Sequence, residues 1–126
     1  MGGILARAPG LGPVGLIWRS EIYDIDLDQP VGHEPANVRP AVVVSIDVIN
    51  NSPGELVAIV PITSTRYGLR SHVELHPGPA RLDHVSYARC DQVRVISTRR
   101  LAAQRGTASV NEVSAIDQAL RFILDL

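Results

Sequence analysis

The chain contains 126 residues, of which 45% are apolar and 20% are charged, and its formal charge at pH 7 is −1. This composition predicts one folded domain with a single core, and the longest apolar stretch, Leu56–Ile62, is far shorter than the ~20 residues that a helix needs to span a bilayer. The single cysteine, Cys90, excludes an internal disulfide and a cysteine-based zinc site.

Residues 1–16 are punctuated by glycine and proline and contain one basic residue, Arg7. They lack the continuous apolar block and the small-residue cleavage site of a secretory signal. We interpret them as a flexible extension and expect the folded domain to occupy residues 17–126. Without an export signal or a cysteine pair, the expected location is the cytoplasm.

A strand and a long loop are predicted first. Residues 21–27 alternate apolar and acidic side chains, with Tyr23 and Ile25 on the apolar face, which indicates a half-buried strand that begins near Trp18. Residues 28–38 contain two prolines, a glycine and polar side chains, the composition of a surface loop. Loops of this length are often functional.

Two buried strands separated by a turn follow. Residues 39–47 are rich in β-branched side chains and predict a buried strand, with Pro40 at its beginning, where no ladder donor is needed. Residues 50–54 reverse the chain. Residues 56–62 are apolar on both faces, which indicates a central strand that ends at Thr63.

The remaining elements are shorter, except for the last. Residues 72–75 predict a short strand, residues 86–96 one or two strands, and residues 98–104 a short helix. Ser109 and Glu112 have the spacing of a capping box and predict the start of a C-terminal helix. The apolar face of that helix comprises Val113, Ile116, Leu120, Ile123 and Leu124.

Short strands at about ten-residue spacing and one terminal helix predict a mainly β fold, either a strongly bent antiparallel sheet or a small barrel plugged by the helix. We expect the core to include Trp18, Tyr23 and Tyr87, and to use Cys90 for packing. The remaining candidate metal ligands lack a zinc spacing and are expected to be isolated surface histidines. These are His72, His76 and His84.

Charge is segregated along the chain. All 12 basic residues are arginines, seven of which fall between Arg66 and Arg100, whereas the stretch from Glu21 to Glu34 contains only acidic charges. Such segregation favours a basic face for an anionic ligand such as RNA, because guanidinium groups bind phosphate in a forked geometry. The alternative is a set of solvated surface arginines.

Five ordered segments of the chain resemble the MazF/PemK family of toxin endoribonucleases. They are Trp18–Asp24, Gly32–Glu34, Arg39–Ser45, Val60–Thr63 and Cys90–Arg94. The resemblance covers about residues 17–125. It implies a homodimer of SH3-like, Kid/CcdB-like plug barrels that cuts single-stranded RNA at specific sequences with no metal or other cofactor, inhibiting translation and growth. It also implies a MazE-like antitoxin peptide that lies over the RNA groove.

Metal-free RNA cleavage uses the ribose 2′-hydroxyl as nucleophile and leaves 2′,3′-cyclic phosphate and 5′-hydroxyl ends. The resemblance implies a catalytic pair, Arg39 and Thr63. We expect Arg39 to stabilise the phosphate charge and to donate a proton, because its pKa is too high for a general base. The alternative for Arg39 is a surface ion pair with Glu34 or Asp47, and for Thr63 a hydrogen bond to local backbone.

Glu34 is the preferred general base, and its neighbour His33 is a candidate RNA contact, although some family members carry serine there. Either residue could instead face solvent. Gln92 is a candidate reader of a base edge through its amide, against the alternative of an ordinary strand residue. Further candidate contacts to the RNA backbone are Ser64, Thr65, Arg66, Arg70 and Arg94.

Two other functions are compatible with the pattern. One is a CcdB-like toxin that binds DNA gyrase without nuclease activity. This chain, which ends Phe122-Ile-Leu-Asp-Leu126, lacks the Trp-Gly-Ile terminus of those toxins and contains the Arg39 and Thr63 pair. The other is an inactive RNA-binding regulator, which would bind RNA and leave it intact.

Overall fold

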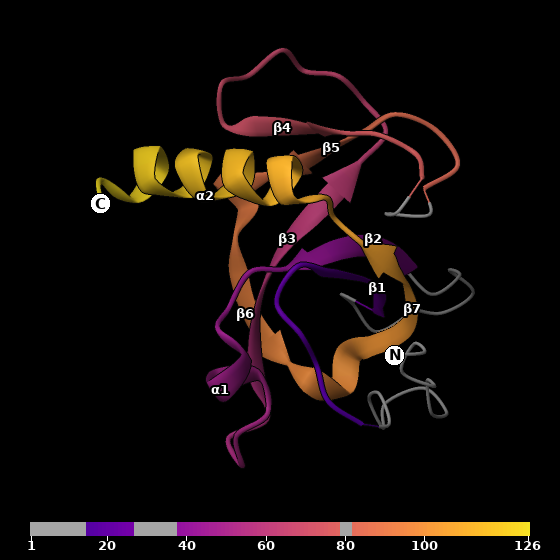
Figure 1. The fold of residues 1–126 in the computed structure, drawn as a ribbon, viewed down its shortest axis with the longest axis vertical. Helices are drawn as coiled ribbons and strands as arrows, with labels where there is room; N and C mark the ends of the chain where they lie inside the picture. The colour runs from indigo at the N-terminus through magenta and orange to yellow at the C-terminus, as the bar shows by residue number, and fades with distance from the viewer. Residues whose placement is uncertain (1–14, 27–37, 79–81) are drawn as a thin grey trace, which may run out of the picture.

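Alternating and β-branched segments form strands that pair into one bent sheet, and a C-terminal helix packs across one face of it (Figure 1). The computed structural model describes residues 15–26, 38–78 and 82–126. The strands are β1 Glu21–Asp26, β2 Val38–Val43, β3 Leu56–Thr63, β4 His72–Leu75, β5 Ser86–Arg89, β6 Arg94–Ser97 and β7 Leu101–Thr107. The helices are α1 Asp47–Asn50, the 3₁₀ turns η1 Cys90–Gln92 and η2 Thr98–Arg100, and α2 Val110–Leu124.

The strand order is β4-β5-β3-β2-β1-β7, and β6 pairs with β3 on the side that β5 also uses. Every pairing is antiparallel. The mainly β fold with a terminal helix is thus confirmed, and β3 is central, as its apolar sequence predicts. Within the described residues the sheet is strongly bent but open, because its outer strands β4 and β7 do not pair with each other.

The core consists of two clusters, one on each face of the sheet, rather than the single core that the composition predicts. Neighbouring residues along a strand alternate between them: Ile22 lies in the cluster beneath α2, and Tyr23 lies in the cluster inside the bend. Ile62 and Ala88 belong to the first cluster, and Ile59 belongs to the second. Cys90 is fully buried in the first, so its predicted packing role is confirmed.

The capping box that begins α2 is present. Ser109 Oγ accepts a hydrogen bond from the Glu112 backbone N–H at 3.2 Å, and Glu112 Oε1 accepts one from the Ser109 N–H at 2.9 Å. The second carboxylate oxygen of Glu112 accepts from the His76 N–H at 2.8 Å, which ties the start of the helix to the end of β4. Ile116 lies buried on the covered face, whereas Leu124, which the sequence places on that face, is 53% exposed.

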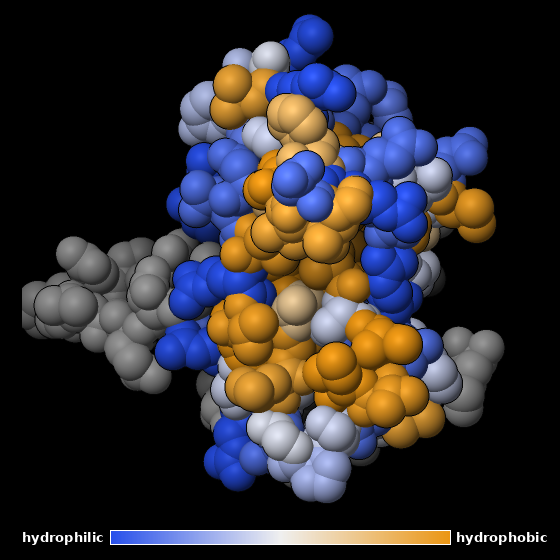
Figure 2. Space-filling model, turned by 90° about the vertical axis from the view of Figure 1, so that its left-hand side faces the viewer, coloured by the Kyte–Doolittle hydropathy of each residue, from blue (hydrophilic) through white to orange (hydrophobic). Residues whose placement is uncertain are grey.

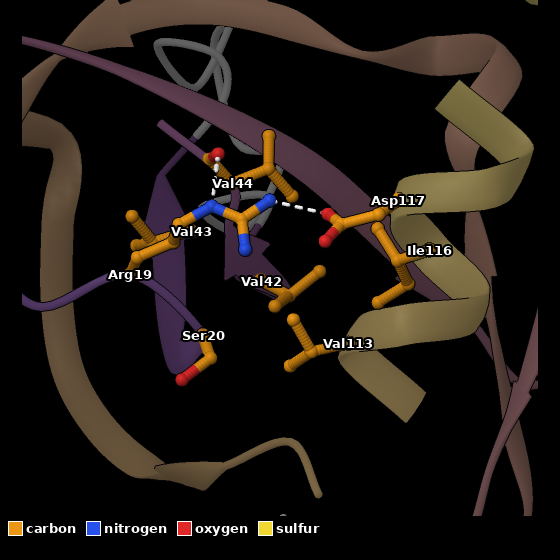
Figure 3. A pocket seen from close by; sticks show the side chains of 8 residues that line it. All are labelled: Arg19, Ser20, Val42, Val43, Val44, Val113, Ile116 and Asp117. Carbon is orange, nitrogen blue, oxygen red and sulfur yellow. Dashed lines mark hydrogen bonds and ion pairs between the residues drawn. The ribbon is translucent and has the colours of Figure 1, made fainter. Parts of the chain in front are cut away.

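A second attachment joins the middle of α2, through Arg19, to the residue that follows β2. Arg19 donates to the Val44 carbonyl at 2.9 Å and forms an ion pair with Asp117 of the helix (Figure 3). The residues around this pair form a small hollow with aliphatic walls, which serves packing. They are Arg19, Ser20, Val42, Val43, Val44, Val113, Ile116 and Asp117.

Three local predictions are wrong. The strand predicted for residues 39–47 ends at Val43, because a polar network turns the chain into α1, with the buried Asn50 amide donating to the Ser45 carbonyl at 2.9 Å. The helix predicted for residues 98–104 is a 3₁₀ turn followed by β7, which pairs with β1. Trp18 is 46% exposed and precedes a turn instead of starting a strand in the core.

The predicted extension over residues 1–16 lies almost entirely outside the described residues, and so does most of the predicted loop over residues 28–38. No helix in the described part of the chain is long and apolar enough to cross a membrane.

Candidate functional site

The pairing of β2 with β3 brings Arg39 and Thr63 to neighbouring positions. The paired register ends with Ala41 opposite Pro61, and Arg39 and Thr63 each lie two residues beyond that pair on their strands. Residues two apart on a strand point to the same face, so Arg39 and Thr63 share the face of Ala41 and Pro61.

The same register continues across the sheet. Tyr87 of β5 lies opposite Thr63, and Glu74 of β4 lies opposite Tyr87. We call Arg39, Thr63, Tyr87 and Glu74 the polar row. It occupies the face that is turned away from α2, because the next residues along these strands pack in the cluster beneath the helix.

The Thr63 hydroxyl also has a local partner. Its Oγ1 accepts a hydrogen bond from the Thr65 backbone N–H at 3.2 Å, so the local bond that the sequence left open as an alternative is present. An accepted bond uses a lone pair of the oxygen and leaves the hydroxyl proton to donate to another acceptor. The bond fixes the hydroxyl at the end of β3 and is compatible with a contact to substrate.

Beside the polar row lies a group of four side chains, which we call the Tyr67 cluster: Tyr67, His72, Arg89 and Asp91. His72 and Arg89 lie opposite each other on β4 and β5, two residues along from Glu74 and Tyr87 and on the same face. His72 Nε2 lies 3.0 Å from Asp91 Oδ1, and the side chain of His72 is only 3% exposed. The rings of His72 and Tyr67 meet edge to face, with centroids 5.7 Å apart.

The cluster corrects one prediction about the histidines. His72 is buried and paired rather than an isolated surface residue, because the register of β4 and β5 turns it inward beside Asp91. His76 and His84 are exposed as predicted, and His76 pairs with Glu74 at 2.9 Å. Among the residues that the structure describes, no three potential metal ligands are grouped around one point.

The other candidate RNA contacts surround the row without joining it. Ser64, Thr65 and Arg66 are exposed and follow Thr63 directly, and Gln92 is exposed in η1, next to Asp91. Arg94 lies opposite Ile59, on the same face as Thr63. Ile59 precedes Thr63 by four residues on β3, which corresponds to about 13 Å along the strand. Arg70 stacks on the ring of Phe122 in α2, with its Cζ atom 4.2 Å from the ring centroid.

Glu34 and His33 lie outside the described residues. The two ends of their segment are nevertheless fixed, because Asp26 at the end of β1 pairs with Val38 at the start of β2. Asp26 and Val38, the described residues on either side of this segment, therefore lie next to Arg39, at the end of β2 where the polar row begins.

Cys90 follows Arg89 but does not join this site. Burial, together with the negative charge of Asp91, raises the pKa of Cys90 to about 12. Because only a thiolate is an effective nucleophile, this thiol is inert at neutral pH.

Sequence reasoning missed the roles of the members of the polar row and the Tyr67 cluster that come from β4, β5 and the segment before β4. It placed Tyr87 in the core, which is wrong, because Tyr87 is only half-buried and belongs to neither core cluster. Tyr87 and Glu74 could have been found by counting the strand registers outward from Thr63. Nothing in the spacing of Tyr67, His72 and Arg89 indicates that the three side chains meet. Their contact depends on how the chain between β3 and β4 folds back over the sheet.

Comparison with known proteins identifies the family. Residues 18–124 match the family described as PemK-like, MazF-like toxin of type II toxin-antitoxin system. A Mycobacterium tuberculosis protein (strain ATCC 25618 / H37Rv) named Endoribonuclease MazF9 is 37% identical over 113 residues, which cover 86% of this chain and 96% of that protein.

Solved structures share the fold over nearly their whole length. The MazE-MazF crystal structure (Form-II) from Deinococcus radiodurans has a TM-score of 0.75 and 25% identity, covering 89% of this chain and 98% of that one. The M. tuberculosis toxin MazF-mt6 has a TM-score of 0.68 and 25% identity, covering 84% and 97%. The open sheet, its terminal helix and the matched residues together establish that this chain belongs to the PemK-like, MazF-like toxins of type II toxin-antitoxin systems.

Proposed function

We propose that this chain is a toxin endoribonuclease that cuts single-stranded RNA at specific sequences, without a metal ion or other cofactor, and so inhibits translation and growth. Membership of the MazF-like family and the relative named Endoribonuclease MazF9 support the enzyme class. The observation that supports the site is the pairing of β2 with β3, because Arg39 and Thr63 lie two residues beyond the Ala41–Pro61 pair and on the same face.

In the proposed reaction Glu34 takes the proton of the ribose 2′-hydroxyl, the 2′-oxygen forms a bond to phosphorus, and the 5′-oxygen leaves with a proton that Arg39 donates. Arg39 donates two parallel N–H bonds to the non-bridging oxygens and stabilises the charge that develops on the phosphorane. The Thr63 hydroxyl donates to the phosphate or to the 2′-oxygen. The products carry 2′,3′-cyclic phosphate and 5′-hydroxyl ends.

Glu34 is the proposed general base. A carboxylate has a suitable basicity, and the segment that contains Glu34 is fixed at both ends beside Arg39. His33, the preceding residue, is proposed to contact the RNA in the same segment.

The rest of the RNA groove is proposed to lie around the polar row. Exposed hydroxyl and guanidinium groups hold the phosphodiester backbone, and the Gln92 amide reads a base edge. The proposed contacts are Ser64, Thr65, Arg66, Gln92 and Arg94. The specific sequence that is cut would depend on the segments at residues 28–38, 64–71 and 76–85.

The proposed partner is a MazE-like antitoxin peptide that lies over this groove and competes with RNA. The solved Deinococcus relative is a MazE-MazF complex, which supports an antitoxin partner for this chain. Coexpressed antitoxin is expected to abolish cleavage and to migrate with the toxin. We also propose that the toxin acts in the cytoplasm.

The proposed assembly is a homodimer. Apolar side chains gather on one side of the molecule, over α1, β6 and the C-terminal end of α2 (Figure 2). We call this region the apolar surface; its exposed residues are Ile46, Val48, Ile49, Leu56, Val95, Phe122, Leu124 and Leu126. Monomeric proteins rarely expose apolar patches beyond a few hundred Å², so a second copy is the proposed cover.

The decisive experiment is digestion of a long RNA of mixed sequence by the purified protein in EDTA, followed by mapping of the new ends. We expect cuts at one short sequence, with cyclic phosphate and 5′-hydroxyl ends. Cleavage that requires added magnesium would contradict the metal-free mechanism. Inhibition of gyrase with intact RNA would support the CcdB-like alternative, and RNA that is bound but never cut would support the regulator.

A further inference from the structure

We propose that Tyr67 is a stacking platform for one nucleobase of the RNA substrate. This inference deepens the proposed function and rests on it. Tyr67 is a large aromatic residue that is 54% exposed in the segment between β3 and β4. An exposed ring is by itself ordinary on a protein surface. The groups that hold this ring, and its position beside the polar row, make it a candidate for RNA recognition.

Charged and polar side chains fix the ring from two directions. The guanidinium carbon of Arg89 lies 5.3 Å from the ring centroid of Tyr67, within the range of a cation–π contact. His72 meets the ring edge to face, at an interplanar angle of 89°. Both supports come from the sheet, from β5 and β4, so the orientation of an exposed ring is set by rigid elements.

The supports are themselves held in place. His72 is buried and bonded to Asp91 at 3.0 Å. Its backbone N–H donates to the Leu69 carbonyl at 3.0 Å, and the Cys90 N–H donates to the Ser71 carbonyl at 3.1 Å. These bonds fasten the segment after Tyr67 to β4 and to the start of η1. The chain just after Tyr67 is therefore attached to the sheet, and the ring is presented to solvent beside it.

The spacing from Thr63 and the pairing of β4 with β5 place Tyr67 near the polar row. Tyr67 comes four residues after Thr63, and its supports, Arg89 and His72, stand two residues from Tyr87 and Glu74 on the same face. A single strand with its scissile phosphate at Arg39 and Thr63 would thus pass close to Tyr67 with a flanking base. Single-stranded RNA is recognised by unstacking its bases onto aromatic rings, and neighbouring arginines add cation–π attraction and neutralise phosphate.

The first test measures binding of an oligonucleotide that contains the mapped cleavage sequence and a 2′-O-methyl group on the scissile nucleotide, which blocks the nucleophile. We expect Tyr67→Ala to raise its Kd ~10-fold or more, and Tyr67→Phe to change it by less than ~3-fold, because phenylalanine keeps the π face. Val110→Ala is the control, since Val110 is an exposed apolar residue of α2 that lies outside the proposed RNA groove. On cleavable RNA, Tyr67→Ala is expected to raise KM and to leave kcat nearly unchanged.

The second test identifies the stacked base. Abasic sites are placed one at a time along the oligonucleotide, and the Kd of each is measured with wild-type protein and with Tyr67→Ala. At one flanking position we expect base removal to weaken wild-type binding ~10-fold and to leave the variant unaffected, because the stacking partner is already gone. A purely structural role for Tyr67 would instead weaken binding by the same factor at every position.

Three outcomes would overturn the platform. The Tyr67→Ala variant could bind RNA as tightly as the wild type, or its loss of RNA affinity could be the same at every abasic position. The third is that the variant loses antitoxin binding or dimerisation while its RNA affinity is intact. Digestion of mixed-sequence RNA by the wild-type protein separates this proposal from the proposed function. If the wild-type protein cuts RNA and the Tyr67 variants match it in Kd and KM, only the platform fails. If the wild-type protein leaves all RNA intact, the proposed function fails with it.

Discussion

At the scale of single residues, the proposed chemistry depends on two side chains that work as different kinds of donor. Arg39 offers a planar fork of N–H groups, whereas Thr63 offers one hydroxyl at the end of a central strand. Each residue can be tested by a variant that keeps its charge or its hydroxyl and changes only the shape of the side chain.

Arg39→Ala is expected to lower kcat by ~10²-fold or more, the usual effect of removing a donor to a developing oxyanion. Arg39→Lys should restore little of this loss, because an ammonium keeps the charge but lacks the bidentate fork. Thr63→Ser should retain most of the activity that Thr63→Val loses. Arg121→Ala on the exposed side of α2 is the control. Equal activity of Arg39→Lys and wild type would argue that only the charge matters.

A buried carboxylate gives the stability of the protein a pH dependence. Burial raises the pKa of Glu21 above its ordinary value of 4.5, and the charge of Asp47 adds to this, against hydrogen bonds from the Trp18 N–H and the Tyr23 hydroxyl. A folded-state pKa above the unfolded one means that the folded state binds the proton more tightly. The stabilising contribution of Glu21 to the free energy of unfolding is therefore fully present below its ordinary pKa of 4.5. This contribution is lost as the pH rises through the folded-state pKa of Glu21.

Urea unfolding of the wild type and of Glu21→Gln between pH 4 and about pH 7 measures this contribution. The free energy of unfolding of the wild type, relative to that of the variant, should fall as the pH rises through this window. A difference that is constant with pH, or that grows, would contradict the raised pKa of Glu21. Asp83→Asn, at an exposed position, is the control that should leave the profile unchanged.

At the scale of elements, local signals predict some segments well. The capping box fixes the start of α2 because Ser109 and Glu112 bond each other's backbone within one turn. The apolar run of β3 predicts a central strand because both of its faces are covered. Residues 98–104 contain good helix formers, yet Leu101 packs inside the bend opposite Ile25 and the segment becomes β7. Tertiary pairing overrides helix propensity there.

The cap of α2 makes a direct prediction for stability. Ser109→Ala removes the acceptor of the Glu112 N–H and is expected to lower the free energy of unfolding by about 1 kcal/mol. Thermal and urea unfolding measure the loss. Asn111→Ala, at an exposed position in the first turn, is the control and should have a much smaller effect. A loss for Ser109→Ala no larger than that of the control would show that the cap contributes little.

At the scale of the whole molecule, the proposed site is assembled from distant segments that meet on one bent sheet. The family resemblance of the sequence predicts Arg39 and Thr63 as a pair, and the pairing of β2 with β3 puts both residues on the same face, two positions beyond the Ala41–Pro61 pair. The Tyr67 cluster is different, because Tyr67, His72 and Arg89 share no spacing signal. They meet through the pairing of β4 with β5 and the fold of the intervening chain. Only three-dimensional structure contains that information.

The apolar surface makes the last prediction. If a second copy covers it, the wild-type protein should sediment as a dimer, and a charge at its centre should release monomers, because an unpaired charge in an apolar interface is costly. Val95→Glu and Val48→Glu place that charge on side chains that are 62% and 78% exposed in the single chain. Neither residue supports the core, so both variants should remain folded.

Val110→Glu is the matched control for this experiment. Val110 is 85% exposed at the opposite end of α2 from the apolar surface, so its variant should remain dimeric. Sedimentation equilibrium gives the mass of each species, and circular dichroism verifies that the variants fold. A wild-type monomer at micromolar concentration, or dimers that persist in both Val48→Glu and Val95→Glu, would mean that a second copy does not cover this surface.

Because the polar row lies on a different part of the sheet from α1 and β6, monomeric variants also test whether one copy of the site cuts RNA without its partner.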